Sequence, residues 1–385
     1  MIRIPSAPCI SIDALKLTTR WLRRMLIAAA VALLSGCSWL GYYGQAIGGQ
    51  WQLLQAREPI EQLLQEDIDP KLRERLQLAL AVLDFAENEM AMPAEGRYQA
   101  YVALPQRYVV WNVFAAGSLS VQPETWCYPI VGCAPYRGYF KERDARGFAE
   151  QLNAEGIETY VGGVAAYSTL GWFDDPILSS FIHWPEPDLV NLLLHELAHS
   201  QVWVNGDVAF NESFASFVGD QGLQLWLATQ RSSDSYALWR EQQSAWPRLR
   251  SLLLDLRAAL AVAYAGPEAQ TAKQRLYAAA QQCYQDHKAV LGQGRYDPLM
   301  DRLNNALLVS ISTYNDWIPA FRQLFLEQGE DWTAFFTAVE RLGDLPMAAR
   351  ETQLLALTEQ QVNHHADHQY ADEVQCEAFS DHTGD

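Results

Sequence analysis

Positive charge is scarce in this sequence. It has 28 lysine and arginine residues against 46 aspartate and glutamate residues, which gives a formal net charge of −18. Proteins that bind nucleic acid neutralise its phosphates with lysine and arginine, so we expect no nucleic-acid partner. The charge balance does not restrict the fold. A chain of 385 residues that is 49% apolar is long enough to bury a substantial core.

Long hydrophobic runs are also missing. The apolar run from Met25 to Leu34 has ten residues, whereas a helix needs about 20 to cross a bilayer. It follows a pair of arginines, which is typical of an export signal. The run LSGC that ends at Cys37 then resembles a bacterial lipobox. This resemblance implies that residues 1–36 are a signal peptide, and that the mature chain begins at a lipidated Cys37.

The lipobox resemblance also predicts where the protein resides. The lipid anchor would hold the mature chain at the membrane, on the periplasmic face of the bacterial envelope. Ser38 stands where retention in the inner membrane usually requires aspartate, which favours the outer membrane. The alternative is an ordinary signal peptide or an uncleaved anchor, in which Cys37 plays no special part.

Cysteine is infrequent, with six residues in the chain. The periplasm permits disulfides, and the prolines and glycine of WCYPIVGCAPYRGYF favour a turn that brings Cys127 and Cys133 together. We therefore predict a disulfide between them. A metal site is the alternative, although no nearby histidine or second cysteine pair completes four ligands. Cys283 and Cys376 could pair or stay free.

Helical and strand patterns divide the chain. Strand-like sequence covers Tyr98–Phe114 and the segment IETYVGGVAAYS from Ile157. Nearly everything beyond Asp188 has helical periodicity. The tail over residues 361–385 is acidic and polar, which predicts partial disorder. The predicted helices are 50–66, 70–90, 141–155, 188–204, 211–227, 236–264, 270–290, 302–311, 316–327, 332–342 and 347–358.

The run HELAH, from His195 to His199, is the strongest chemical signal. It lies in DLVNLLLHELAHSQVWV, which has no glycine or proline and is predicted to be helical. A helix places two histidines four residues apart on one face, where both can bind one Zn²⁺. Glu196 lies beside the first histidine and is the predicted general base.

Glu212 is the predicted third ligand. It follows His199 by thirteen residues and opens the run NESFASFVGDQG, which is typical of a second helix. Three protein ligands leave a fourth position for water, as catalytic zinc requires. The alternative is that Glu212 only caps this helix together with Asn211.

Several blocks together resemble a known family. WCYPIVGCAPYRGYF, GGVAAYSTLGWFDDP, HELAH and FNESFASFV resemble the bacterial predicted aminopeptidases, which are gluzincin-like enzymes of the periplasm or lipoproteins. The resemblance spans most of the mature chain and implies one zinc ion and an aminopeptidase activity. One position departs from the pattern. Related third-ligand helices often carry an acidic residue seven positions after the ligand, where this sequence has Gly219 followed by Asp220.

Other residues are assigned supporting roles. Metal-bound histidines usually donate a second hydrogen bond to a carboxylate or carbonyl, for which Asp207 and Asp220 are candidates. Tyr314 is the predicted donor to the oxyanion of the reaction, with Tyr167 as the competing position and a buried core tyrosine as the structural alternative.

The segment GGVAAYSTLGWF, which contains Gly163 and Tyr167, could bind an extended peptide as an added strand, or could be a plain core strand. Asp174 or Asp175 could bind the α-amine of a substrate, although acids before a proline are more often turn formers. The tail histidines His364, His365 and His368 are expected to have only accidental metal affinity.

We therefore predict an α+β protein that is predominantly helical, with a small β-sheet region in its N-terminal part. Residues 37–360 would form one zincin-like metallopeptidase domain that hydrolyses peptides by metal-activated water. Two alternatives stay open: an endopeptidase or other zinc hydrolase of the envelope, and an envelope lipoprotein that holds metal without catalysis. The sequence leaves the oligomeric state open.

Overall fold

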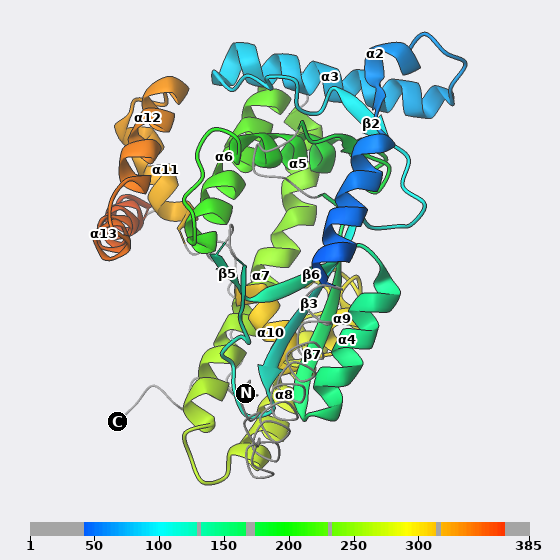
Figure 1. Ribbon diagram of the computed structural model, residues 1–385. Helices are drawn as coiled ribbons and strands as arrows, with labels where there is room; N and C mark the ends of the chain where they lie inside the picture. Colours follow the sequence, from blue (N-terminus) through cyan, green and yellow to red (C-terminus); the bar gives the residue numbers. More distant parts are fainter. Residues whose placement is uncertain (1–41, 129–131, 167–173, 230–232, 313–316, 366–385) are drawn as a thin grey trace, which may run out of the picture. The chain divides into compact units, whose positions relative to one another are not determined.

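The computed structural model describes residues 42–128, 132–166, 174–229, 233–312 and 317–365 (Figure 1). The chain divides into two compact units, the first ending at Gln55 and the second beginning at Ala56. The described part of the first unit is a helix over residues 42–55. Every element named below belongs to the second unit. None of the described helices is long and apolar enough to cross a membrane.

The strands of the second unit form small sheets. The first sheet has the order β1-β2-β8, with β1 antiparallel and β8 parallel to β2. The second has the order β6-β3-β7 and is antiparallel throughout, and β4 and β5 form a hairpin. The strands are β1 (Glu58–Pro59), β2 (Ala100–Val102), β3 (Val110–Gly117), β4 (Trp126–Tyr128), β5 (Gly132–Ala134), β6 (Tyr136–Tyr139), β7 (Ile157–Val164) and β8 (Ile177–Leu178).

Helices make up most of the second unit, so the structure is α+β and mainly helical, as predicted. The helices are α2 (Ile60–Leu63), α3 (Pro70–Met90), α4 (Glu142–Ala154), α5 (Glu186–Ala198), α6 (Val208–Thr229), α7 (Ser233–Ala263), α8 (Ala269–Asp286), α9 (Asp297–Met300), α10 (Asn305–Ser312), α11 (Ile318–Glu327), α12 (Trp332–Gly343) and α13 (Met347–His365).

The β6-β3-β7 sheet has helices α4 and α10 packed against it. Because side chains alternate across a strand, Phe114 and Ala116 of β3 pack with Val309 of α10. On β6, Tyr139 instead contacts the ring of Phe148 on α4. The sheet is therefore buried between the two helices, which Figure 1 shows on either side of it.

A buried polar network joins this sheet to α8 and α10. Lys273 of α8 forms an ion pair with Glu158 of β7 and donates a hydrogen bond to the carbonyl of Ser118. Glu158 also accepts a hydrogen bond from the backbone N–H of Asn305. The side chain of Asn305 accepts from Tyr264 and Tyr277 and donates to nearby carbonyls. Each buried polar group named here has a partner, as a stable interior requires.

The remaining helices pack around α5 and α6. Helix α5 lies along α6, α3 packs on α5, and α11 packs on α6 and α13 (Figure 1). An aromatic cluster fills the space between α6, α11 and α12, where Phe214 and Phe217 contact the rings of Phe321, Phe325 and Phe335. Helices α5 and α6 are therefore each packed against other helices of the second unit.

Two differences between the predicted and the observed elements lie in the region before Gly117. The predicted helix 50–66 ends at residue 55 and is followed by β1 and α2, because Pro59 has no N–H group and cannot continue a helix. The predicted β region Tyr98–Phe114 splits between two sheets, with β2 in one and β3 in the other. Sequence patterns specify strands, whereas the choice of partner strand depends on residues far away in the chain.

Candidate metal centre

Helix α5 presents both histidines of HELAH. A proline and two acidic residues in its first turn suit a helix start. His195 lies in its last turn, and His199 is the C-cap residue with helical backbone angles. The helix thus ends at Ala198 instead of continuing to Val204 as predicted. Its buried residues are Leu189, Val190, Leu193, Leu194, Leu197 and Ala198.

Glu212, near the start of α6, faces both histidines. Its carboxylate oxygens lie 3.5 Å from Nε2 of His195 and 3.7 Å from Nε2 of His199. One potential ligand atom of each residue lies within 4.8 Å of the others. Ligands of a tetrahedral zinc ion, each about 2.0–2.1 Å from the metal, are roughly 3.4 Å apart. The structure therefore brings the three predicted ligands together at nearly the spacing that zinc requires.

Asn211 holds the loop that joins the two ligand helices. Its side chain is fully buried, accepts a hydrogen bond from the N–H of Val204 at 2.8 Å, and donates one to the carbonyl of Val204 at 2.8 Å. On the other side of Glu212, the hydroxyl of Ser213 accepts a hydrogen bond from the N–H of Trp317. Both neighbours of Glu212 are therefore fixed, which restricts the orientation of the ligand.

Two glycines allow α6 to approach α5 closely. A Cβ atom at Gly219 would lie 2.9 Å from the backbone oxygen of Asn191 and 3.3 Å from Cβ of His195. A Cβ atom at Gly222 would lie 2.7 Å from the side chains of Leu194 and Met90. Such contacts are shorter than packed atoms tolerate. The small residue at position 219 thus permits the short distance between the two ligand helices.

Burial and neighbouring charges shift the pKa of Glu196 strongly. Removal from water raises its pKa from the usual 4.5 to about 7, the charge of His195 opposes this, and the carboxylates of Glu212 and Asp175 add to it. A carboxyl group in a partly dry site next to other carboxylates behaves in this way. In the metal-free protein Glu196 therefore titrates close to neutral pH.

The two histidines respond differently to the same surroundings. Burial and the charge of His195 lower the pKa of His199 to about 4, although Glu212 opposes this. For His195, burial also lowers the pKa, but the contact with Glu212 and the nearby carboxylates outweigh it and raise the pKa overall. Burial would raise the pKa of Glu212, yet the histidines hold it below its usual value. His199 and Glu212 therefore favour the deprotonated forms that bind metal.

Residues 41–354 match the family described as "Putative aminopeptidase". The chain belongs to this family. Comparisons with curated proteins and with solved structures find no match. The family covers most of the chain, and its residues include α5, α6 and the helices around them.

Tyr98 and Asp175 lie near Glu196, and sequence patterns alone did not single out Tyr98. The N–H of Tyr98 donates to the carbonyl of Asp175 at 2.7 Å, and both side chains are buried. Burial and the charges of Glu196 and Asp175 raise the pKa of Tyr98. Tyr98 has a φ of 60°, which is uncommon for a residue other than glycine. Of these two residues, only Asp175 was a candidate from the sequence, as one of two acids that could bind the α-amine of a substrate.

Asp207 and Asp220, the two candidate hydrogen-bond partners of the metal-bound histidines, have different surroundings. Asp207 accepts hydrogen bonds from Arg350 at 2.8 and 2.9 Å and caps α6 by accepting from the N–H of Phe210. Asp220 accepts from the amide of Asn191 at 2.8 Å, and its charge helps to raise the pKa of His195. Nδ1 of His199 is buried and has no hydrogen-bond partner within the described residues. Asp220 is thus near the centre, whereas Asp207 belongs to an ion pair.

The other described candidates lie on different elements. Asp174 is exposed, and its backbone oxygen accepts a hydrogen bond from Arg57. Gly163 lies on β7 opposite Trp111, and the ring of Tyr108 occupies the space that a side chain there would need. Neither residue contacts the histidines in the part of the chain that the structure describes.

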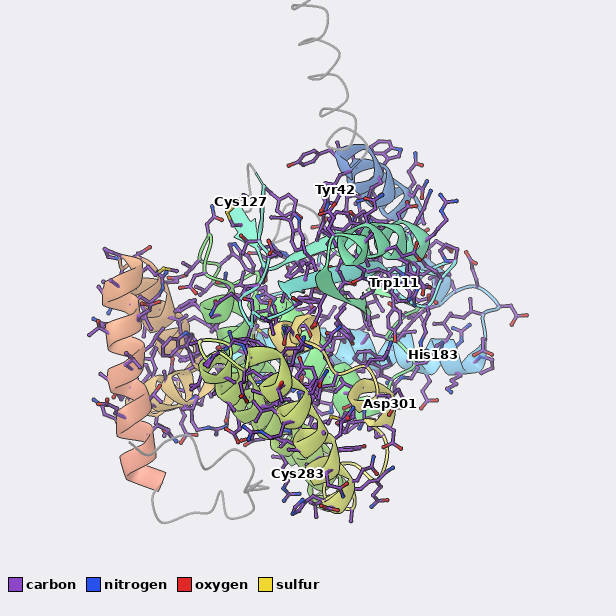
Figure 2. The ribbon with its side chains drawn as sticks, turned by 90° about the horizontal axis from the view of Figure 1, so that it is seen from below. Tyr42, Trp111, Cys127, His183, Cys283 and Asp301 are labelled. Atoms are coloured by element: carbon purple, nitrogen blue, oxygen red, sulfur yellow. A yellow bond between two sulfur atoms is a disulfide. The ribbon has the colours of Figure 1, made fainter. Side chains whose placement is uncertain are left out.

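Cys127 and Cys133 are joined by a disulfide between β4 and β5. Figure 2 shows Cys127 on this hairpin, on a different element from Cys283 of α8. A Cβ atom at Gly132 in the hairpin would lie 3.8 Å from Cα of Gly206, in the loop between the ligand helices. The cross-linked hairpin therefore lies against the loop that Asn211 holds.

Several predicted residues lie outside the described residues. They are Cys37, Tyr167, Tyr314 and Cys376, together with the side chains of His364, His365 and His368. Their predicted roles stay predictions. Helix α13 continues to His365, so the first residues of the segment 361–385 are helical.

Proposed function

We propose that the chain is a zinc-dependent peptidase that acts as an aminopeptidase on short peptides. The observation that carries this proposal is the convergence of His195, His199 and Glu212 from two helices, with Glu196 next to the first ligand. Two imidazoles and one carboxylate suit catalytic zinc, which keeps a fourth position open. The family to which the chain belongs supports the peptidase activity.

Each group then has a definite task. A zinc ion held by the three ligands would polarise the scissile carbonyl and acidify a water molecule. Glu196 takes the proton of the attacking water and passes it to the leaving amine. The buried leucines of α5 hold Glu196 and both histidines on one rigid element and limit access of water. The hydrogen bonds of Asn211 keep Glu212 directed at the histidines.

The test combines metal analysis with hydrolysis of a peptide panel. Purified protein should hold one zinc ion per chain, and Glu196→Gln should retain zinc while losing roughly 10²–10⁴-fold in hydrolysis rate. Glu186→Gln, at the opposite end of the same helix, is the matched control and should keep full activity. Protein without stoichiometric zinc, or an active Glu196→Gln variant, would contradict the proposal.

The same panel separates aminopeptidase from endopeptidase activity. Each peptide is supplied with a free and with an acetylated N-terminus. An aminopeptidase hydrolyses only the free form, because it binds the α-amine, whereas an endopeptidase hydrolyses both. Equal rates on both forms would retain the zinc peptidase and reject the aminopeptidase.

We also propose that the mature chain is anchored by a lipid on Cys37 at the periplasmic face of the outer membrane. The support is the basic, apolar and small-residue pattern that ends in LSGC. Mass analysis of the mature N-terminus should find an acylated cysteine at position 37, and Cys37→Ser should abolish this acylation and lower the share of the protein in the membrane fraction. An N-terminus elsewhere would contradict the anchor without affecting the peptidase proposal.

A further inference from the structure

The segment around the helix over residues 42–55 has no charge. Between Arg24 and Arg57 the sequence contains no Asp, Glu, Lys or Arg, although 19% of the chain is charged. The helix itself, YYGQAIGGQWQLLQ, has glutamine as its main polar residue. Helices that face water usually carry charged residues on their outer side. This composition is therefore unusual for a helix in contact with water alone.

One side of this helix is apolar and open. Ile47 is 69% exposed and Trp51 is 60% exposed, and residues four apart lie on the same side of a helix. Gly44 and Gly48 fall on this side too, and a Cβ atom at either would meet nothing within 4 Å. Figure 2 labels Tyr42 at the start of the helix. The helix thus presents a flat surface with an isoleucine and a tryptophan projecting from it.

We infer that this face of the helix over residues 42–55 lies in the interface of a lipid bilayer. Tryptophan and tyrosine are enriched where a membrane meets water, and the helix combines both with small and apolar residues. A helix of this length extends about 21 Å, which is shorter than the hydrocarbon core, so it lies in the plane of the interface. An absence of charge also lowers the cost of bringing this face close to the hydrocarbon core, because moving a charged group out of water is costly.

The position of the helix in the chain supports the same partner. Tyr42 follows Cys37 by five residues, a stretch that can extend at most about 18 Å. The inference rests on the proposed lipid anchor for its location, since lipid on Cys37 would hold the helix at the membrane surface. It does not depend on zinc or on peptide hydrolysis. The helix would add a second contact, and anchors with two contacts bind membranes more stably.

Quenching of tryptophan fluorescence tests the contact in the lipidated full chain. The protein is placed in vesicles of phosphatidylethanolamine and phosphatidylglycerol with a fraction of brominated lipid, which quenches only nearby tryptophans. Trp51→Phe should remove a measurable part of the quenching. Trp184→Phe is the matched control, because Trp184 is exposed on the second unit, and it should leave the quenching unchanged. Equal quenching in wild type and Trp51→Phe would overturn the inference.

The mature chain produced without its lipid separates the helix from the anchor. Replacing both Ile47 and Trp51 by glutamine should lower its partition into the same vesicles by about tenfold or more, because two interfacial apolar side chains are lost. Val262→Gln, which changes another exposed apolar residue, should leave the partition unchanged. Equal partition of the double variant and wild type would overturn the inference. So would a dimer that the double variant dissociates while neither protein binds vesicles, since the face would then join two copies.

Discussion

Gly219 of α6 lies directly against the backbone oxygen of Asn191 on α5, because a Cβ atom there would be 2.9 Å from that oxygen. Gly219→Ala therefore pushes the helices apart one turn before His195. We expect it to lower the free energy of unfolding by about 1–3 kcal/mol, which is typical of overpacking. Zinc affinity should also fall, since His195 and Glu212 come from the two separated helices. Urea unfolding and competition with a zinc chelator measure the two effects.

Gly147→Ala is the matched control for that substitution. Gly147 lies inside α4, and a Cβ atom there would meet nothing within 4 Å. Alanine in an open helical position stabilises by about 0.5–1 kcal/mol relative to glycine. If Gly219→Ala behaves like Gly147→Ala, the close approach of α5 and α6 is not required for the metal centre.

The two hydrogen bonds between the side chain of Asn211 and the backbone of Val204 can also be tested. Asn211→Ala removes both hydrogen bonds that fix the loop before Glu212. We expect a loss of about 1–3 kcal/mol in the free energy of unfolding, because partly buried backbone groups lose their partner. Zinc affinity should decrease as well, since the loop and Glu212 become less ordered.

Asn88→Ala provides the comparison. Asn88 is exposed on α3 and its amide donates to Asp84 of the same helix, so its replacement should change stability by less than about 0.5 kcal/mol. Asn211→Asp gives a finer test, because it retains an acceptor for the N–H of Val204 and loses the donor to the carbonyl. A variant at Asn211 with wild-type zinc affinity would show that the loop does not position Glu212.

The ligand set could be predicted from sequence because its geometry is local. His195 and His199 are one helical turn apart, and Glu212 lies near the start of the next helix, so the two short motifs were sufficient to name all three residues. The supporting contacts are not local. Arg350 reaches Asp207 across 143 positions, and Tyr98 meets Asp175 through the pairing of distant segments. Nothing in the spacing of these residues records such contacts, since they depend on how complete helices and strands pack.

Strand pairing also depends on contacts between distant parts of the chain. The aromatic and β-branched residues of Tyr98–Phe114 predicted strands, but β2 pairs with β8 and β3 pairs with β6 and β7. Pairing is decided by which faces are buried. Asp207 was likewise predicted as a candidate hydrogen-bond partner of a metal-bound histidine, whereas in the structure it pairs with the buried Arg350, far away in the chain.

The pair of Asp207 and Arg350 predicts a large effect on stability. Both side chains are buried, and Arg350 also donates to the carbonyls of Gly343 and Leu345. Arg350→Met should lower the free energy of unfolding by about 3–5 kcal/mol, because it leaves a buried carboxylate without its cation. Adding Asp207→Asn should restore part of the loss, since asparagine also caps a helix and carries no charge.

Arg146→Met is the control for the ion pair. Arg146 and Glu142 pair on the exposed surface of α4, with side chains 56% and 42% exposed. Exposed pairs contribute about 0–1 kcal/mol. The folded Arg350→Met, Asp207→Asn double variant should still bind zinc, because Asp207 does not contact a histidine in the described structure. Loss of zinc from this folded variant would instead assign Asp207 to the metal centre.

Glu196 predicts a pH-dependent stability of the metal-free protein. Its pKa rises from 4.5 to about 7 on folding. Below pH 4.5 both states hold the proton, so the group has no effect. Between the two values the unfolded chain releases the proton and the folded chain keeps it, so stability falls as pH rises. Above pH 7 the full cost is present, about 3 kcal/mol from a shift of this size.

Glu196→Gln removes this titration, so the variant should become increasingly more stable than the wild type as the pH rises. In chelator we expect the variant to be more stable by under about 1 kcal/mol at pH 5 and by about 3 kcal/mol at pH 8. Urea unfolding at the two pH values measures the difference. Any change in packing that the substitution causes is the same at both pH values and therefore cancels. Asp175→Asn should reduce the growth with pH, because Asp175 is one of the charges that raise the pKa of Glu196. A difference that is the same at both pH values would show that Glu196 titrates alike in the folded and unfolded chains.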